Sequence, residues 1–147
     1  MLKIIYYSRG SLIPALFCAE KHCRPASTPE QTLRRVQQWL ADHGGDAGPV
    51  TLLPYENEGE STSIYIMTAS APPGLVERTL SNLFRLLDRG DPDSFILVSS
   101  LPFSRSSAAR QAGLILSPKK LRALWPEIEA AVQQARLQIA LLEKLNS

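Results

Sequence analysis

The stretch LKIIYYSRGS, residues 2–11, decides the fold of this chain. Residues 2–7 are short, mostly apolar and rich in strand formers, which predicts a buried β-strand. Residues 8–11 follow at once and predict a glycine loop. Residues 12–22 then predict a helix, in which Pro14 is tolerated because it lies in the first turn. A strand, a glycine loop and a helix in this order are typical of a layered α/β domain.

A second helix is predicted to begin at Thr28 and to end at Gly44-Gly45. Thr28 and Gln31 match a capping box, and Pro29 suits the first helical position. Its apolar side chains recur every three or four residues and form one face. That face consists of Leu33, Val36, Trp39 and Leu40.

Residues 50–53 and 63–68 predict the two strands of a β-hairpin. Pro54 cannot donate to a neighbouring strand, so the first of these strands lies at a sheet edge or stops there. Between the strands, Glu56, Glu58 and Glu60 predict a solvated, acidic turn.

The remainder of the chain predicts a helix over residues 75–87 and a central strand over residues 95–98. The sequence of that strand, FILV, is apolar throughout, as expected of a strand covered on both faces. Residues 104–110 predict a short helix, and residues 113–116 predict a last short strand. A long C-terminal helix follows, kinked or split at Pro126.

Strands that alternate with helices favour an α/β fold with a mainly parallel sheet. We predict a single domain over residues 1–147 with a Rossmann-like layered sheet. An antiparallel hairpin lies at its edge, helices cover both faces, and the C-terminal helix is long.

Composition excludes several classes of protein. The 16 basic and 14 acidic residues give a net charge of +2, too near neutral to indicate nucleic acid or an anionic membrane as partner. No apolar run reaches the roughly 20 residues that cross a bilayer. The first residues do not resemble a signal peptide, so a cytoplasmic location is expected.

The two cysteines are too few for a disulfide framework. Cys23 follows His22, but tetrahedral zinc needs three or four ligands, and His43 is the only other histidine. We therefore predict no metal and no cofactor, and we interpret His22 as a helix-end histidine beside an inert thiol.

The loops after the first strand and after the central strand are the candidate ligand site. Ligands of open α/β sheets bind beyond the carboxyl ends of the strands. A glycine loop that enters a helix offers backbone N–H groups to an anion. If the two strands are neighbours, both loops open on one crevice. The candidate residues are Ser8, Arg9, Gly10, Ser11, Ser99, Ser100 and Arg105.

Three interpretations of these loops stay open. One is non-catalytic binding of a small anionic or nucleotide-like ligand. Another is a plain strand-to-helix turn in which Gly10 supplies a backbone angle. The third is a serine- or arginine-dependent hydrolase or transferase, which is disfavoured because neither His22 nor His43 is positioned as a base. We assign no catalytic residue.

The C-terminal helix supports an alternative function as a protein-interaction or dimerisation module. Its apolar residues recur at spacings of three and four. Such a stripe usually covers a sheet, but turns that outrun the sheet would suit a contact between two helices. The homodimer stripe consists of Ile128, Val132, Ala135, Ile139, Leu142 and Leu145.

Three segments resemble a family of short proteins of unknown function from spore-forming Firmicutes. They are KIIYY before the glycine loop, IYIM in the middle, and ILVSSLPFS before the C-terminal helix. The resemblance implies a shared fold but no established activity. The family's first loop carries a His-Ser-Ser-like run, of which only Gly10 and Ser11 have counterparts here. This departure favours a binding, partner or structural role.

Overall fold

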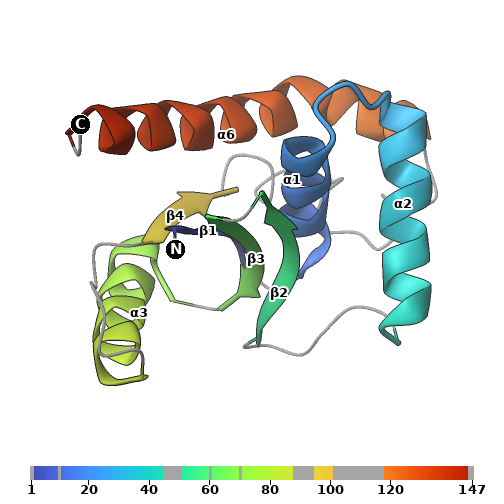
Figure 1. The fold of residues 1–147 in the computed structure, drawn as a ribbon. Coiled ribbons are helices and arrows are strands. Elements are labelled where there is room, and N and C mark those ends of the chain that lie inside the picture. The colour runs from blue at the N-terminus through green and yellow to red at the C-terminus, as the bar shows by residue number, and fades with distance from the viewer. Residues whose placement is uncertain are drawn as a thin grey trace.

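The computed structural model describes residues 2–9, 11–44, 51–59, 61–69, 71–87, 95–100 and 118–145. The elements in these ranges are β1 (Leu2–Ser8), α1 (Ile13–Cys23), α2 (Pro29–Asp42), β2 (Thr51–Glu58), β3 (Thr62–Thr68), α3 (Pro73–Leu87), β4 (Phe95–Ser99) and α6 (Pro118–Leu145) (Figure 1). The helix predicted at 104–110 and the strand predicted at 113–116 lie outside the described residues, as do Gly10, Glu60 and Arg105.

The four described strands form one mixed sheet in the order β2-β3-β1-β4. β1 is parallel to both of its neighbours, β3 and β4, and β2 pairs with β3 in the antiparallel sense. The predicted mainly parallel sheet with an antiparallel hairpin is confirmed. Among the described strands β4 takes the last place and β1 an inner one, so the prediction that residues 95–98 form the central strand is not confirmed. An apolar run reports burial, but it carries no information on strand order.

The hairpin differs from its prediction in where the turn lies. β2 continues to Glu58, and the register shifts between Pro54 and Glu56. Gly59 in the turn has a φ of 70°, a left-handed conformation that glycine adopts without steric cost. Glu56 and Glu58 are therefore strand residues rather than turn residues. β2 is at the sheet edge, as Pro54 predicted.

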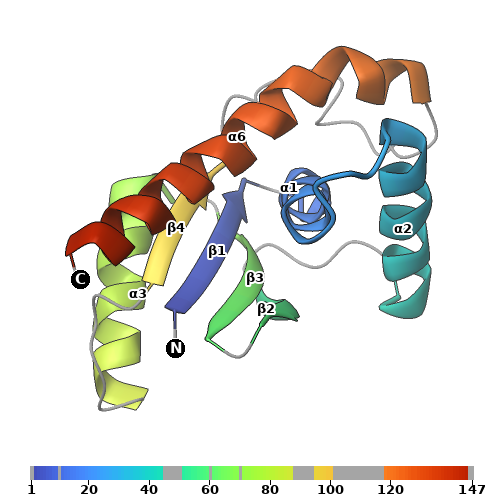
Figure 2. The same cartoon turned by 45° about the horizontal axis from the view of Figure 1, so that its top comes forward.

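β1 contributes side chains to the hydrophobic clusters on both faces of the sheet, because its alternate residues point in opposite directions. Ile4 and Tyr6 belong to a cluster that includes residues of α1, α2 and α6. Ile5 and Tyr7 belong to a second cluster with residues of α3. All four side chains are fully buried. Figures 1 and 2 show α1 and α6 on one side of the sheet and α3 on the other.

α6 is one continuous helix that contains Pro126, so the helix is not split there. The kink that was the other predicted outcome stays a prediction. A proline inside a helix removes one hydrogen bond and costs about 3 kcal/mol. Leu121 and Leu124 before Pro126, and Ile128 after it, all lie in the same core cluster. Packing on both sides offsets this cost. Within the described ranges, no helix is both long enough and apolar enough to cross a membrane.

Candidate functional site

The carboxyl ends of β1 and β4 meet at one edge of the sheet. Tyr7 is opposite Ser99 in the parallel ladder, and the Ser100 backbone N–H donates to the Tyr7 carbonyl at 2.8 Å. Ser8, the last residue of β1, therefore lies close to Ser99 and Ser100 at the end of β4, although more than 90 residues separate them in the sequence. The two strands are neighbours, which is the condition on which the predicted common crevice depends.

The serine hydroxyls at this edge are used by the fold itself. Ser8 Oγ donates to the Ser11 carbonyl at 2.5 Å, and Ser11 Oγ accepts from the Ile13 backbone N–H at 3.1 Å. Ser100 Oγ donates to the Tyr7 carbonyl at 2.5 Å. Ser8 and Ser100 are fully buried. These hydroxyls shape the turn into α1 and join β4 to β1, which disfavours a nucleophilic role for them.

Arg9 is the exposed cation of this edge. Its guanidinium hydrogen-bonds to the side chain of Tyr7. The hydroxyl of Tyr7 in turn donates to the carbonyl of Ala69 at 3.2 Å and to the carbonyl of Ala71. Burial raises the pKa of Tyr7, and the nearby Arg9 opposes that rise. Arg9 and Tyr7 thus bring the loop after β1 next to the loop after β3.

The edge has a positive electrostatic character. α1 and α3 both begin here, and neither carries an acidic residue in its first turn. The N-terminus of a helix carries about half a positive charge. Among the described residues of the loops after β1, β3 and β4, Arg9 is the only charged side chain.

A second polar cluster, which the sequence analysis missed, surrounds His22. The imidazole is fully buried, with Nδ1 2.7 Å from the Tyr6 hydroxyl and Nε2 2.6 Å from Glu58 Oε2. A carboxylate only accepts, so Nε2 carries the proton and Nδ1 accepts from Tyr6. Burial lowers the pKa of His22, and Glu58 opposes this effect. Tyr6, His22 and Glu58 share no local spacing that could have revealed the cluster.

One earlier interpretation is therefore wrong. Glu58 is not part of a solvated turn, because it lies on β2 and hydrogen-bonds to His22. His22 does lie at the end of α1, as predicted, but its side chain is buried in this cluster. The interpretation of Cys23 as an inert thiol is supported. Burial raises the pKa of Cys18 to about 12, and burial is also the main cause of the raised pKa of Cys23.

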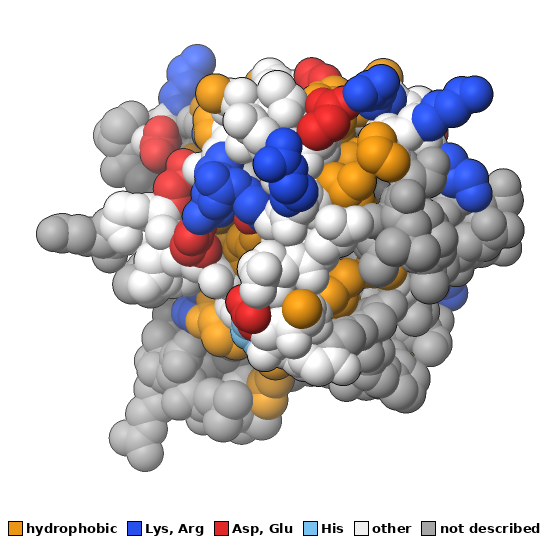
Figure 3. Space-filling view, turned by 90° about the vertical axis from the view of Figure 1, so that its right-hand side faces the viewer, with side chains coloured by type: hydrophobic (Ala, Val, Ile, Leu, Met, Phe, Trp, Pro, Cys, Tyr) orange, Lys and Arg blue, Asp and Glu red, His pale blue; other side chains and the backbone are white. Residues whose placement is uncertain are grey.

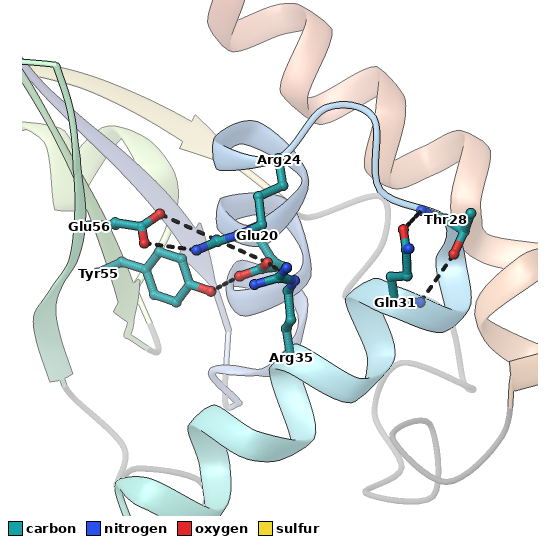
Figure 4. A network of polar contacts seen from close by, with 7 residues as sticks. All are labelled: Glu20, Arg24, Thr28, Gln31, Arg35, Tyr55 and Glu56. Atoms are coloured by element: carbon teal, nitrogen blue, oxygen red, sulfur yellow. Dashed lines mark hydrogen bonds and ion pairs between the residues drawn. The ribbon is translucent and has the colours of Figure 1, made fainter.

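A third cluster joins α1, α2 and β2 around Glu20, whose side chain is only 2% exposed. Glu20 Oε1 lies 3.0 Å from Arg24 Nη1 and 3.4 Å from Arg35 Nε, and Glu20 Oε2 accepts from the Tyr55 hydroxyl. Arg24 also pairs with Glu56 at 3.0 Å. Figure 4 shows these side chains converging from the three elements. Burying a carboxylate is costly unless charged donors surround it, and here they do.

The residues of the predicted dimer stripe are divided between the core and the surface. Ile128, Val132 and Ala135 lie in the core cluster, and Ile139 and Leu142 pack partly buried against it. Leu145 is 81% exposed. The first three are buried by the chain's own α1, α2 and sheet, so they are not available to a second copy. Dimerisation itself stays a prediction.

In the part of the chain that the structure describes, no three His, Cys, Asp or Glu residues are placed to hold a metal ion. Comparison with known proteins finds no matching family model, curated protein or solved structure. The resemblance to the Firmicute family accordingly stays a prediction.

Proposed function

We propose that this chain is a Rossmann-like, cytoplasmic α/β protein that binds a small anionic or nucleotide-like ligand without catalysis. The ligand lies at the carboxyl edge of the sheet. Arg9 and the backbone N–H groups of the loop before α1 hold it. Ser99 and Ser100, at the end of β4, form the other wall.

The order of the strands supports this location. From β1 the chain crosses to β3 on one side, and from β3 it crosses back to β4 on the other side. Open α/β sheets bind ligands where the connections diverge in this way, outside the carboxyl ends of the strands. In this chain the connections that leave β1 and β3 run in opposite directions across the sheet.

The observation that carries the proposal is the charge of the edge. Two helix N-termini and the guanidinium of Arg9 gather there. An anion is the ligand that such a site stabilises, through backbone N–H groups and one guanidinium.

Binding is favoured over catalysis by the positions of the two histidines. His22 is hydrogen-bonded to Tyr6 and Glu58. His43 stacks on Trp39 at the end of α2, with ring centroids 3.9 Å apart. The contacts that the structure gives for both rings thus lie on other residues than the serines of the edge. A hydrolase or transferase would need a base there.

The first test is a thermal-shift titration with inorganic pyrophosphate and with ATP. Binding stabilises the folded chain by about 2.7 kcal/mol when the ligand is at 100 times its Kd, so at least one anion should raise Tm. Arg9→Ala should weaken binding about tenfold, because one charge-assisted hydrogen-bond partner is lost.

Arg78→Ala is the matched control, because it removes the same charge from an exposed position on α3. It should leave binding unchanged. The proposal is contradicted if neither anion raises Tm, or if Arg78→Ala weakens binding as much as Arg9→Ala.

The alternative function, dimerisation through α6, is supported by a different observation. Leu137, Leu141 and Leu145 are 57%, 62% and 81% exposed and are spaced by four residues, so they form one apolar stripe. We expect any dimer to use this stripe. Light scattering should then give a mass twice that of one chain, and Leu141→Glu should return it to one chain. A single-chain mass for the unmodified protein at every concentration would remove this alternative.

A further inference from the structure

A pocket of about 240 Å³ lies between α2 and β2, and it shares no residue with the sheet edge. Trp39 and Tyr55 contribute its aromatic side chains, and Arg35, Asp42 and Glu56 contribute charged ones. Pockets for drug-sized ligands measure about 300–1,000 Å³, so this one suits a smaller molecule. Figure 3 shows basic, acidic and apolar side chains mixed on the face of the molecule to which α2 belongs.

The side chains of the pocket are held in place by contacts behind them. Arg35 is fixed through its Nε by the buried Glu20, and the hydroxyl of Tyr55 donates to the same carboxylate. His43 stacks on Trp39 with an interplanar angle of 11°. Asp42 accepts from Gln38 Nε2 at 2.8 Å. A site whose side chains are already ordered loses less entropy when a ligand binds.

The wall formed by α2 presents a cation, an aromatic ring and an anion in order along one helix face. Arg35, Trp39 and Asp42 are spaced by four and three residues, so they follow one another by single turns. The first and last are about 10 Å apart along the axis, at 1.5 Å per residue. Both charged side chains are exposed. A complementary ligand carries an anion, a hydrocarbon segment and a cation in the same order.

The charged side chains that line the pocket balance one another. They are two guanidinium groups, Arg24 and Arg35, and two carboxylates, Asp42 and Glu56. Arg24 and Glu56 already pair with each other at 3.0 Å. Arg35 and Asp42 are therefore the charged groups that a ligand with oppositely charged ends would meet. A basic amino acid with a free carboxylate has such ends, and an aliphatic chain separates them.

We infer that this pocket binds a basic amino acid that has a free carboxylate. The carboxylate pairs with Arg35, the aliphatic chain lies against Trp39 and Tyr55, and the cationic end lies at Asp42. Arginine and tryptophan faces attract each other, which adds to the binding of a guanidinium end. Free L-arginine and a peptide with a C-terminal arginine offer this same chemistry.

Isothermal titration calorimetry with L-arginine tests the inference directly. We expect saturable binding, and we expect weaker binding of agmatine, which lacks the carboxylate, and of L-citrulline, whose side chain carries no positive charge. The tripeptide Gly-Gly-Arg distinguishes the two sources. Tighter binding of the tripeptide assigns the site to a chain terminus, and tighter binding of L-arginine assigns it to the free amino acid.

The variants Arg35→Gln and Asp42→Asn should each weaken L-arginine binding about tenfold, because each removes one charged partner. Arg34→Gln is the matched control, since Arg34 is the exposed neighbour of Arg35 and does not line the pocket. Asp42 does not contact Glu20, so Asp42→Asn keeps the test valid if Arg35→Gln fails to fold. No saturable binding up to about 10 mM, equal binding of L-citrulline, or an equal effect of Arg34→Gln overturns the inference.

Discussion

Ile128→Ala is expected to lower the free energy of unfolding by about 2–5 kcal/mol, the usual cost of removing a large aliphatic side chain from a core. The side chain of Ile128 is fully buried in the main core cluster. Its loss leaves a cavity where α6 packs against the rest of the chain. Urea denaturation followed by circular dichroism measures the effect as a fall in the midpoint with an unchanged slope.

Leu137→Ala is the matched control on the same helix. Leu137 is 57% exposed, so its truncation should change the free energy of unfolding by less than about 0.5 kcal/mol. If both variants lower the free energy of unfolding by the same small amount, Ile128 does not pack in the core as described. If Leu137→Ala is the more costly one, the exposed stripe is buried in an assembly.

Stability is also expected to fall when the pH decreases below about 6.5, because of His22. Burial lowers the pKa of His22 from its ordinary value of 6.5, so the folded chain keeps the imidazole neutral. The unfolded chain takes up a proton near pH 6.5. The contribution of His22 is therefore complete above that pH and is lost as the pH falls toward the lower folded pKa.

The surroundings of His22 explain why the neutral form fits. Tyr6 on β1 donates to Nδ1, so a proton on that nitrogen would displace this hydrogen bond. Arg136 on α6 donates to the His22 carbonyl at 2.8 Å, and its charge also lowers the pKa of His22. Glu58 acts in the opposite direction. Thermal unfolding between pH 5 and 7.5 measures the net result.

His22→Gln should remove this pH dependence, whereas His43→Gln should preserve it because His43 is exposed. Tyr6→Phe should cost about 1–3 kcal/mol at neutral pH, since it leaves the buried Nδ1 without its donor. A pH profile that is unchanged by His22→Gln, or abolished by His43→Gln, would exclude His22 as the cause.

The candidate sites differ in how far the sequence could predict them. The loop after β1 was found because a strand, a glycine and a helix are local signals that act within about ten residues. The pocket beside Glu20 was not found, since Arg35 and Tyr55 belong to elements with no local pattern in common. Charged residues on a helix face are normally solvated. Only the packed chain shows that Arg35 shares the buried carboxylate of Glu20 with Arg24.

The sequence by itself determined the local structure of this protein. The mostly apolar run in residues 2–8 produced a strand buried on both faces, and the capping box of Thr28 and Gln31 is present as predicted. Tertiary structure alone decided that β1 lies between β3 and β4, that Ile128 faces the core, and that Tyr6, His22 and Glu58 meet. The physical reason is range. Propensity and capping act between near neighbours, whereas strand order and buried polar pairs depend on which distant surfaces exclude water together.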